Sequence, residues 1–585
     1  MTNLEIAELL RSVAAAYELK GKGPFNRFKI GAYQKAADSI EHSTMELKDL
    51  WEEGKLDQVP GIGSAIAKYL GELFKTGKVR HFHSVMQDLP SAMFTFMQVP
   101  GIGAKIAYKL CQELKIHEEK DALKRLEELA KLGKIREIEG LGTESEAGIL
   151  RNLQELKERG AARMLLPVAS SIADDILVWL KKTPAVLRAD PLGSLRRHVA
   201  TVGDVDISVA SDKPREVIEH FKNYPKKVRL IEAGPHTSSI LVTGGAQVDL
   251  MVQPPVSYGA LLAHFTGSKH HNIALREFAL RRGLSLSEYG IKKLRTHNPE
   301  LKTYRTEDEF YRELGLDWIE PELREDTGEI EASYHHKLPK LVKLEDIKGD
   351  FHLHSSFSIH TSHDEGLHNF AEMVKKAESL GYEYLGFSEH NPSQSGTTKN
   401  EVLTLLKRKK EAIEKLKSAK IHHIFNGLEV DITPNGKLAL PNEAVDLLDY
   451  MIVSVHSSFR LSKSEQTKRV LAGLSHPKAK IFGHPTGRRL NKREGIELDW
   501  EKIFAFCEEH KKLLEINSWY DRLDLPDNLV REAVKRGIKM IINTDSHQLD
   551  HMELMRYGVF VARRGWAEKD DIVNTLPYIE FKEIF

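Results

Sequence analysis

The sequence predicts a multidomain protein with an α-helical N-terminal region, an α+β middle region and a C-terminal α/β region. Residues 1 to about 155 are rich in Leu, Ala, Lys and Glu, with apolar residues at helical spacing. From about 160 to 320, segments such as TVGDVDISVA and ILVTGGAQVDLMVQ alternate as strands do, and Gly244-Gly245 is typical of a hairpin turn. After 349, short apolar strands alternate with helices. This βα repeat predicts a parallel sheet or barrel.

Length and composition exclude several classes of protein. At 585 residues the chain exceeds the size of a single core and predicts several compact units. With 41% hydrophobic and 29% charged residues, it is typical of a folded protein. Lys+Arg and Asp+Glu number 85 each, so a nucleic-acid surface would have to be a local basic patch.

The expected compartment is the cytoplasm. The two cysteines, Cys111 and Cys507, lie far apart, which argues against a disulfide scaffold and for a reducing environment. The first residues lack a signal-peptide pattern. No apolar run of about 18 residues predicts a membrane span.

One pentapeptide occurs twice in the helical region. VPGIG spans 59–63 and 99–103, and IEGLG at 138–142 is a looser third copy, for which a structural role is the alternative. Each VPGIG precedes a helical stretch, so backbone N–H groups beside the glycines and the helix N-terminus can face a DNA phosphate. A tight turn between helices would explain one copy alone. Two copies predict helix-hairpin-helix units that bind the DNA backbone through Gly61, Gly63, Gly101 and Gly103.

Three aspartates indicate a cation site in the middle region. Asp204 and Asp206 lie two residues apart in a strand pattern, so their carboxylates face one side, and Asp249 lies in a second strand. Close carboxylates repel one another unless cations lie between them, and two Mg²⁺ (or Mn²⁺) ions are the usual answer. The turn 193–197, GSLRR, offers backbone, hydroxyl and guanidinium donors that suit a triphosphate. A solvated pair of aspartates is the alternative for the Asp-x-Asp motif alone.

Histidines and carboxylates end the apolar strands of the C-terminal region. His352 and His354 end one strand with both imidazoles on one face. Functional groups of βα folds gather at the strand C-termini, so these side chains are expected to converge. Mixed nitrogen and oxygen ligands suit Zn²⁺, Mn²⁺ or Fe²⁺. The set comprises His352, His354, His390, Glu429, His456, His484, Asp545 and His547.

The motifs GSLRR, VGDVD, VDL and FTGSKHHN together resemble family X DNA polymerases, and the chain is most similar to the bacterial and archaeal type with a C-terminal PHP domain. The resemblance covers nearly the whole chain. It implies that Asp204 and Asp206 bind both palm metals and that Asp249 binds the catalytic metal. The implied dNTP-binding residues are Ser194, Arg197 and Gly203 at the triphosphate, Phe265, Thr266, Gly267 and Ser268 at the sugar, Asn272 at the base and Arg276 on the template side.

The C-terminal set resembles the PHP (polymerase and histidinol phosphatase) domain, a distorted seven-stranded βα barrel. The resemblance implies that the eight strand-end residues hold up to three Zn²⁺, Mn²⁺ or Fe²⁺ ions. Many PHP domains add an Asp after the HxH pair, but this chain has Ser358-Ile359-His360. A variant of the domain has a His six residues after the second His of the HxH pair. His360 stands at that position after His354 and is therefore expected to be the ninth ligand. His363, His422 and His423 are expected to be surface or supporting residues.

The resemblance also implies domain boundaries and departures from the family pattern. The expected units are a small helical domain (1–85), a fingers-like helical domain (86–160), a polymerase-beta-like nucleotidyltransferase palm (161–255), a thumb-like domain (256–320), a polar linker (321–348) and the PHP domain (349–585). His264 stands where a Tyr is frequent, and Met251 where a basic residue is common. Tyr69, with Lys68 beside it, stands where a lyase Lys is expected. Lys29 and Tyr33 are the remaining candidate DNA contacts of the first domain.

The function expected from this resemblance is gap filling in DNA repair, combined with a 3′–5′ exonuclease, and in some relatives cutting at abasic sites. Its partners would be gapped or primer-template DNA and dNTPs, without a membrane, and the chain would act as a monomer. One alternative is a PHP phosphoesterase whose polymerase is weak or silent, because His264 and Met251 depart from the family pattern in the polymerase region. A non-catalytic binder of DNA ends is the other alternative.

Overall fold

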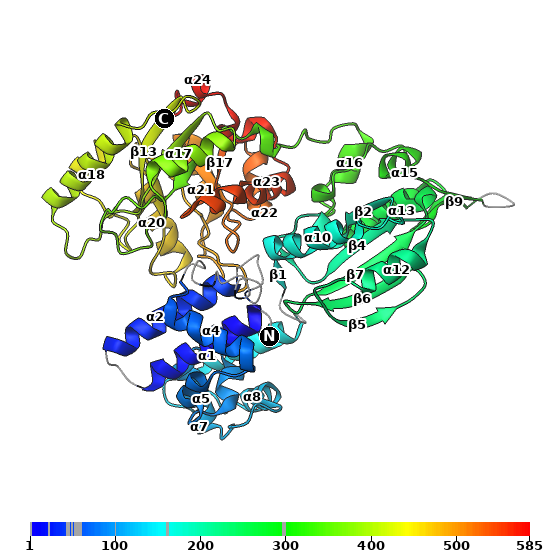
Figure 1. Ribbon diagram of the computed structural model, residues 1–585. Helices are drawn as coiled ribbons and strands as arrows, with labels where there is room; N and C mark the ends of the chain where they lie inside the picture. Colours follow the sequence, from blue (N-terminus) through cyan, green and yellow to red (C-terminus); the bar gives the residue numbers. More distant parts are fainter. Residues whose placement is uncertain are drawn as a thin grey trace.

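The computed structural model describes residues 3–20, 24–41, 47, 51, 56, 61–99, 101–158, 163–294 and 300–585. Figure 1 shows a helical N-terminal part in blue and cyan, a sheet-containing middle part in green, and a C-terminal part running from green to red. Within these ranges, no helix has the length and apolarity required to span a membrane.

The N-terminal part is helical, as predicted, and has two cores. The first is built from α1 (Asn3–Lys20), α2 (Pro24–Glu41), α4 (Ser64–Thr76) and α5 (Arg80–Met86), with fully buried residues such as Leu10 and Leu70. The second is built from α6 (Ser91–Phe96), α7 (Ala104–Glu113), α8 (Ala122–Lys131) and α9 (Thr143–Glu158). The first core includes Ile62 of the first glycine hairpin, and the second includes Ile102 of the second hairpin and Leu141 of the third.

The part predicted to be the palm, called the palm below, contains a five-stranded mixed sheet in the order β2-β4-β7-β6-β5. Its strands are β2 (Arg188–Pro191), β4 (Val205–Ala210), β5 (Lys227–Ala233), β6 (Thr237–Val242) and β7 (Gln247–Gln253). The predicted hairpin turn at Gly244-Gly245 joins β6 to β7, with φ values of +97° and +78°. The other palm elements are β1 (Met164–Leu165), α10 (Leu166–Leu180), α11 (Gly193–Arg196), β3 (Thr201–Val202) and α12 (Pro214–Lys222).

The thumb follows, and the segment expected to be a linker folds against it. The thumb comprises η2 (Pro255–Ser257), α13 (Tyr258–Thr266), α14 (Lys269–Arg281), β8 (Leu284–Ser287), β9 (Gly290–Lys293), β10 (Leu301–Lys302) and α15 (Glu307–Glu313). Residues 321–348 then form η3 (Pro321–Leu323), α16 (Glu329–Tyr334) and η4 (Leu344–Asp346).

The linker prediction was wrong for the first half of that segment. Arg324 is fully buried and donates to Glu307 at 2.7 Å. Glu329, also buried, lies 2.6 Å from His271 Nδ1. The polar composition therefore reflects buried charges that are paired with one another, rather than a solvated connection.

The C-terminal part is the predicted βα barrel. Seven parallel strands lie in sequence order: β11 (Gly349–Leu353), β12 (Tyr384–Phe387), β13 (His423–Asp431), β14 (Tyr450–Ser454), β15 (Ala479–Phe482), β16 (Leu513–Asn517) and β17 (Met540–Asn543). The first and last strands approach one another, because His354 N donates to Ser546 O at 2.8 Å and Ser546 N donates to His352 O at 3.0 Å. The barrel is therefore nearly closed.

Helices surround the barrel, and aromatic side chains fill one end of it. The helices are α17 (Phe370–Ser379), α18 (Lys399–Glu414), α19 (Asn442–Val445), α20 (Lys463–Leu474), α21 (Trp500–His510), α22 (Asp527–Lys535), α23 (Met555–Arg564) and α24 (Tyr578–Phe581), with short turns η5 (Leu549–Leu554), η6 (Lys569–Asp571) and η7 (Val573–Thr575). Phe351, Tyr384 and Tyr450 pack there with Phe581 of α24. The opposite end, where the strands terminate, carries the polar side chains.

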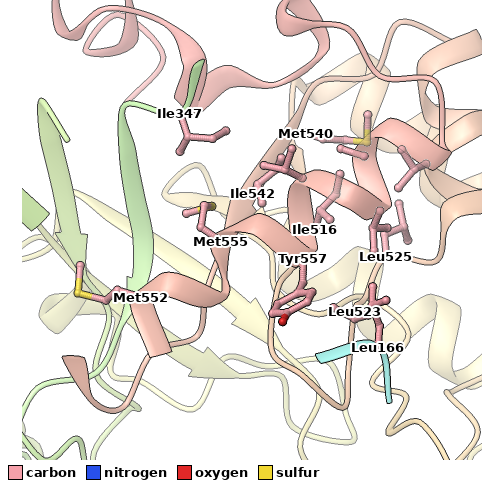
Figure 2. Close-up of a cluster of buried hydrophobic side chains, with 14 of the residues drawn as sticks. Leu166, Ile347, Ile516, Leu523, Leu525, Met540, Ile542, Met552, Met555 and Tyr557 are labelled. Atoms are coloured by element: carbon pink, nitrogen blue, oxygen red, sulfur yellow. The ribbon is translucent and has the colours of Figure 1, made fainter. Parts of the chain in front are cut away.

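One apolar core joins the palm to the barrel. Leu166, at the start of α10, belongs to the same buried cluster as Leu523 and Tyr557 of the C-terminal part. Figure 2 shows Leu166 close to these two side chains. The palm and the barrel are consequently packed against each other as parts of one structure.

Candidate active sites

The three palm aspartates converge as the sequence predicts. Asp206 in β4 lies opposite Asp249 in the parallel strand β7, and Asp204 immediately precedes β4. One carboxylate oxygen of each lies within 4.8 Å of the others. Burial raises the pKa of Asp206 to about 7, and the charges of Asp204 and Asp249 add to the effect. Three carboxylates this close together repel one another, and divalent cations bound between them would neutralise that repulsion. The triad is therefore a suitable site for such ions.

Gly193 allows the GSLRR turn to approach this site closely. Its φ is +56°, and a Cβ on it would lie 2.7 Å from Asp206 Oδ2. Only glycine fits both conditions without strain. The turn is also closed by Val199 N, which donates to Ser194 O at 3.0 Å. Ser194 and the following arginines are therefore held beside the aspartates.

The two arginines of the turn have different partners. Arg196 forms a double hydrogen bond with Glu307, at 3.0 and 2.5 Å. Arg197 Nε donates to Glu325 Oε1 at 3.0 Å, and its Nη1 donates to the carbonyl of Thr266 at 2.7 Å. Arg196 is thus committed to a buried ion pair with the thumb. Arg197 joins the turn to the FTGS segment, where a bound dNTP is expected.

The expected sugar and base contacts lie around one tight turn. Gly267 has φ +22°, and a Cβ there would collide with the side chain of Asn272. Asn272 Nδ2 donates to the carbonyl of His264 at 2.7 Å, and Arg276 Nη2 lies 3.5 Å from His264 Nδ1. This arrangement orders the segment containing Phe265 and Gly267. Gly203 lies elsewhere, between β3 and β4.

The predicted strand-end ligands meet at the C-terminal end of the barrel. Their potential ligand atoms form groups in which every atom lies within 4.8 Å of the others. His352 and His354 group with Asp545, and His352 also groups with Glu429 and His484. His354 groups with His390 and His547. Each of the eight predicted residues except His456 appears in these three groups, and His456 appears in a fourth that is described below.

The crowding of buried polar atoms indicates that this cluster fits metal ions. Atoms that make no hydrogen bond include His352 Nε2, both ring nitrogens of His354, His390 Nδ1 and Glu429 Oε2. Some of them face one another, since Glu429 Oε2 lies 2.8 Å from His390 Nδ1 and 3.2 Å from His352 Nε2. Buried polar groups that are not fully satisfied are costly. Coordination of metal ions would satisfy them, and the mixture of imidazole and carboxylate suits Zn²⁺, Mn²⁺ or Fe²⁺.

The structure corrects the prediction for the ninth ligand. His360 is exposed, belongs to none of the groups formed by the described residues, and lies near Glu401 at the start of α18. His363 instead groups with His390 and His456, with ring centroids 4.6 and 4.8 Å from theirs. The backbone of residue 360 adopts φ +54°, and its carbonyl accepts Ser393 N at 3.0 Å. The loop thus carries His363, rather than His360, to the cluster.

Two carboxylates behind the cluster were not predicted. Glu515 Oε1 lies 2.7 Å from His352 Nδ1, and Asp431 Oδ1 lies 2.5 Å from His456 Nδ1. Asp431 also lies 3.0 Å from His363 Nε2. A carboxylate on one ring nitrogen fixes the tautomer and turns the other nitrogen toward the metal. Asp431 follows Glu429 by two residues on β13, a spacing that could have revealed it.

Three family models match the chain in order along its length. They are the helix-hairpin-helix domain over residues 1–79, the DNA polymerase beta thumb over 261–325 and the PHP domain over 350–519. The chain is 32% identical to the DNA polymerase/3′-5′ exonuclease PolX of Bacillus subtilis (strain 168), over 98% of this chain and 97% of the relative. The chain belongs to the PolX family, the family X DNA polymerases with a C-terminal PHP domain.

Two further relatives each match part of this PolX chain. DNA polymerase lambda of Rattus norvegicus is 23% identical over 55% of this chain and 56% of its own length. A probable phosphatase of Caldicellulosiruptor bescii is 27% identical over 31% of this chain and 73% of its own length. The relatives of this chain thus include both a DNA polymerase and a probable phosphatase.

The glycine hairpins of this PolX chain have matching backbones. Gly61, Gly101 and Gly140 have φ values of +82°, +83° and +79°. The carbonyls of Gly63, Gly103 and Gly142 each accept the N–H four residues on, at 2.9, 2.9 and 3.1 Å. The first turns of α4 and α7 contain no acidic residue, whereas α9 begins with Glu144 and Glu146.

Glu146 gives the third hairpin surroundings that the other two lack. It is buried, and its carboxylate accepts the backbone N–H groups of Ile135 and Arg136 at 3.0 Å each. This side chain ties the hairpin to its own domain. The same carboxylate also accepts Arg136 Nε at 2.6 Å, so its charge is paired within the domain.

The other expected DNA contacts of the first domain have different surroundings. Tyr33 is 4% exposed and stacks on Tyr17 in the core, so its expected contact with DNA does not fit the structure. Lys29 is exposed and places its ammonium 4.8 Å from the Tyr17 ring centroid. Tyr69 stacks on His81 at 4.7 Å, while Lys68 is exposed. Lys29 therefore remains a candidate phosphate contact.

Proposed function

We propose that this chain is a DNA-directed DNA polymerase that fills gaps during DNA repair, and a 3′–5′ exonuclease through its PHP domain. The observation that carries the proposal is the presence of two separate clusters of candidate metal ligands in one PolX chain: the aspartate triad of the palm and the histidine cluster of the barrel. A protein that only bound DNA ends would need neither.

The palm would extend the primer by in-line nucleotidyl transfer. Two Mg²⁺ or Mn²⁺ ions on Asp204, Asp206 and Asp249 would neutralise phosphate charge and activate the primer 3′-OH. Ser194, Arg197 and Gly203 would hold the triphosphate, and Phe265 and Gly267 would form the wall beside the sugar. Asn272 would contact the base and Arg276 the template. The hydrogen bonds of Asn272 and Arg197 around residues 264–267 support a pocket ordered before dNTP binds.

The barrel would remove nucleotides from the 3′ end. Up to three Zn²⁺, Mn²⁺ or Fe²⁺ ions would supply a hydroxide near neutral pH and a clamp for the phosphodiester. Glu515 and Asp431 would accept the Nδ1 protons of His352 and His456 and so present their Nε2 atoms to the site. Arg488 donates to the carbonyl of Arg522 at 2.9 Å, and Arg489 to Asp521 at 2.9 Å, so both hold loops of this end.

The partners would be gapped or primer-template DNA and dNTPs, and the chain would act as a cytoplasmic monomer. The hairpins at Gly61, Gly63, Gly101 and Gly103 would hold the DNA backbone, with Lys29 beside them. Positively charged or neutral first turns on α4 and α7 support this assignment.

The test is an assay with a labelled primer on a one-nucleotide gap in Mn²⁺, with and without dNTPs. The wild-type protein should extend the primer with dNTPs and shorten it without them. Asp249→Ala should lose extension alone, and His354→Ala should lose shortening alone. Shortening without extension by the wild type would instead support the PHP phosphoesterase with a silent polymerase, which His264 and Met251 kept open.

A further inference from the structure

A helix of the PHP domain contacts the triphosphate-binding turn of the palm. Arg564, the last residue of α23, donates through Nη1 to the backbone carbonyl of Arg197 at 2.9 Å. The same nitrogen donates to Glu325 Oε1, also at 2.9 Å. That oxygen is the one that accepts Arg197 Nε at 3.0 Å. Glu325 therefore lies between a guanidinium of the polymerase and a guanidinium of the PHP domain.

Arg564 is held rigidly from its own side. Its side chain is only 9% exposed, and its Nε donates to Asp527 Oδ2 of α22 at 2.7 Å. Burial opposes the charge, but Asp527 and Glu325 keep the pKa of Arg564 above its usual value. A buried guanidinium with two carboxylates and a carbonyl has little freedom to move. Arg564 thus fixes the positions of Glu325 and of the Arg197 carbonyl relative to the barrel.

A second contact joins the same turn to the same helix. The His198 ring lies flat on Phe560 of α23, with centroids 3.5 Å apart and planes 2° from parallel. His198 has φ +52°, and its Nδ1 lies 3.2 Å from Glu322 Oε1. Glu322 Oε1 also accepts Arg563 Nε at 2.7 Å. The end of the turn is therefore fixed by stacking and by a second carboxylate shared with α23.

We propose that helix α23 of the PHP domain is a positioning element of the polymerase site, acting through Arg564, Glu325 and Arg197. The proposal rests on the proposed function, in which Arg197 binds the triphosphate of the incoming dNTP. Arg564 shares the charge of Glu325. Without it, Arg197 would be the only guanidinium partner of Glu325 among the described residues, and Glu325 would draw Arg197 away from the phosphates. Arg564 and Glu325 are positioning residues, since they act on dNTP only through Arg197.

The experiment measures single-nucleotide gap filling by the full-length protein as a function of dNTP concentration. For Arg564→Ala we expect the KM for dNTP to rise roughly 10-fold, with kcat changed by less than about 3-fold. Arg564→Lys keeps the charge and should recover part of the KM. Shortening of the primer without dNTPs should stay within about 2-fold of wild type, because Arg564 lies outside the histidine cluster. That second activity shows that the variant is folded.

Arg531→Ala is the control. Arg531 of α22 is half-buried and lies over the ring of Trp566, 3.8 Å from its centroid, and Trp566 Nε1 donates to Thr327 Oγ1 across the same interface. Among the described residues, Arg531 has no bond to Arg197, His198, Glu322 or Glu325. We expect its KM for dNTP to stay within about 2-fold of wild type. An equal rise in KM for both variants would overturn the proposal, because it would show a general loosening of the interface.

A double variant tests the path through Glu325. In a Glu325→Gln background, Arg564→Ala should change the KM by less than about 2-fold, since the shared carboxylate is already lost. Full additivity would overturn the path. An unchanged KM in Arg564→Ala, with wild-type protein that extends primers, would overturn the positioning role alone. Failure of the wild type to extend would refute the proposed function itself.

Discussion

Asp206 is the aspartate of the palm site whose ionised form is disfavoured by its surroundings. Burial, then Asp204 and Asp249, raise its pKa to about 7. In an unfolded chain an aspartate has a pKa of about 3.9. A raised pKa for an acid means that the fold disfavours the ionised form. In metal-free protein, Asp206 therefore lowers the free energy of unfolding increasingly as pH rises from about 4 to 7. Above about pH 7 this loss has reached its full size and no longer changes with pH.

We expect Asp206→Asn to stabilise the metal-free protein while abolishing primer extension. The gain in the free energy of unfolding should be about 1–2 kcal/mol at pH 8, after allowance for solvent screening, and should vanish near pH 4. Urea unfolding in EDTA at both pH values measures it. Asp212→Asn, an exposed site beyond the end of β4, is the control and should have no such pH-dependent gain. A loss of stability at pH 8 would contradict the argument.

His363 and His360 provide a comparison within one loop. His363 is grouped with His390 and His456 and is supported by Asp431, whereas His360 is exposed. We expect His363→Ala to reduce bound Mn²⁺ and to slow primer shortening by about 10- to 100-fold. His360→Ala should have less than about a 2-fold effect on either quantity. Metal content by mass spectrometry and exonuclease rates decide between them, and the reverse ranking would restore the original prediction for His360.

The hairpins show how the first turn of a helix determines its partner. All three have nearly the same backbone, but only α9 begins with acidic residues. A helix N-terminus attracts anions, and acidic side chains in the first turn already satisfy it. The repeat in the sequence therefore predicts a repeated structure, whereas the flanking charges distinguish the two hairpins that we propose to bind DNA from a third that is tied to its own domain.

Gly103→Ala tests this difference. Gly103 has an ordinary φ of −80°, and a Cβ on it would meet nothing within 4 Å, so the fold should accept it. A phosphate approaching the hairpin would meet the methyl group, and we expect the Kd for gapped DNA to rise about 3- to 10-fold. Gly142→Ala, equally open in the third hairpin, should leave the Kd unchanged. Fluorescence anisotropy measures both, and equal effects would argue against a DNA contact at Gly103.

For the whole molecule, the main feature is the continuous apolar core that joins the palm to the barrel. Leu166 is fully buried in the cluster that includes Leu523 and Tyr557 (Figure 2). A continuous core predicts that the palm and the PHP domain unfold together. The core also supports the proposed positioning role of α23, because it holds the palm and the barrel in a constant relative position.

Leu166→Ala should weaken this core by about 2–5 kcal/mol. We expect calorimetry to show one main transition for palm and barrel in the wild type, and two in Leu166→Ala. Leu180→Ala removes an equally buried side chain at the other end of α10. It should lower the transition temperature without dividing the transition. Separate transitions in the wild type would show that the palm and barrel are independent.

Much of this architecture follows from local patterns in the sequence. The βα repeat after residue 349, the β6–β7 hairpin and the convergence of the aspartates were predicted, because strand periodicity and the common end of parallel strands determine where side chains point. The convergence of the eight candidate ligands at the strand ends was predicted for the same reason. The resemblance to family X supplied the roles of these groups, and the comparisons confirmed the family.

The tertiary structure alone decided the remainder, since it depends on contacts between distant residues. A loop, unlike a strand, has no fixed period, so which of His360 and His363 reaches the cluster depended on its path. The charges near 321–334 suggested solvent exposure, but their partners, Glu307 and His271, lie in the thumb. Tyr33 matched a DNA contact by position and is buried by packing. The sequence by itself determined which chemical groups end which strands; the packing of palm against barrel, including Arg564 against Arg197, appeared only in three dimensions.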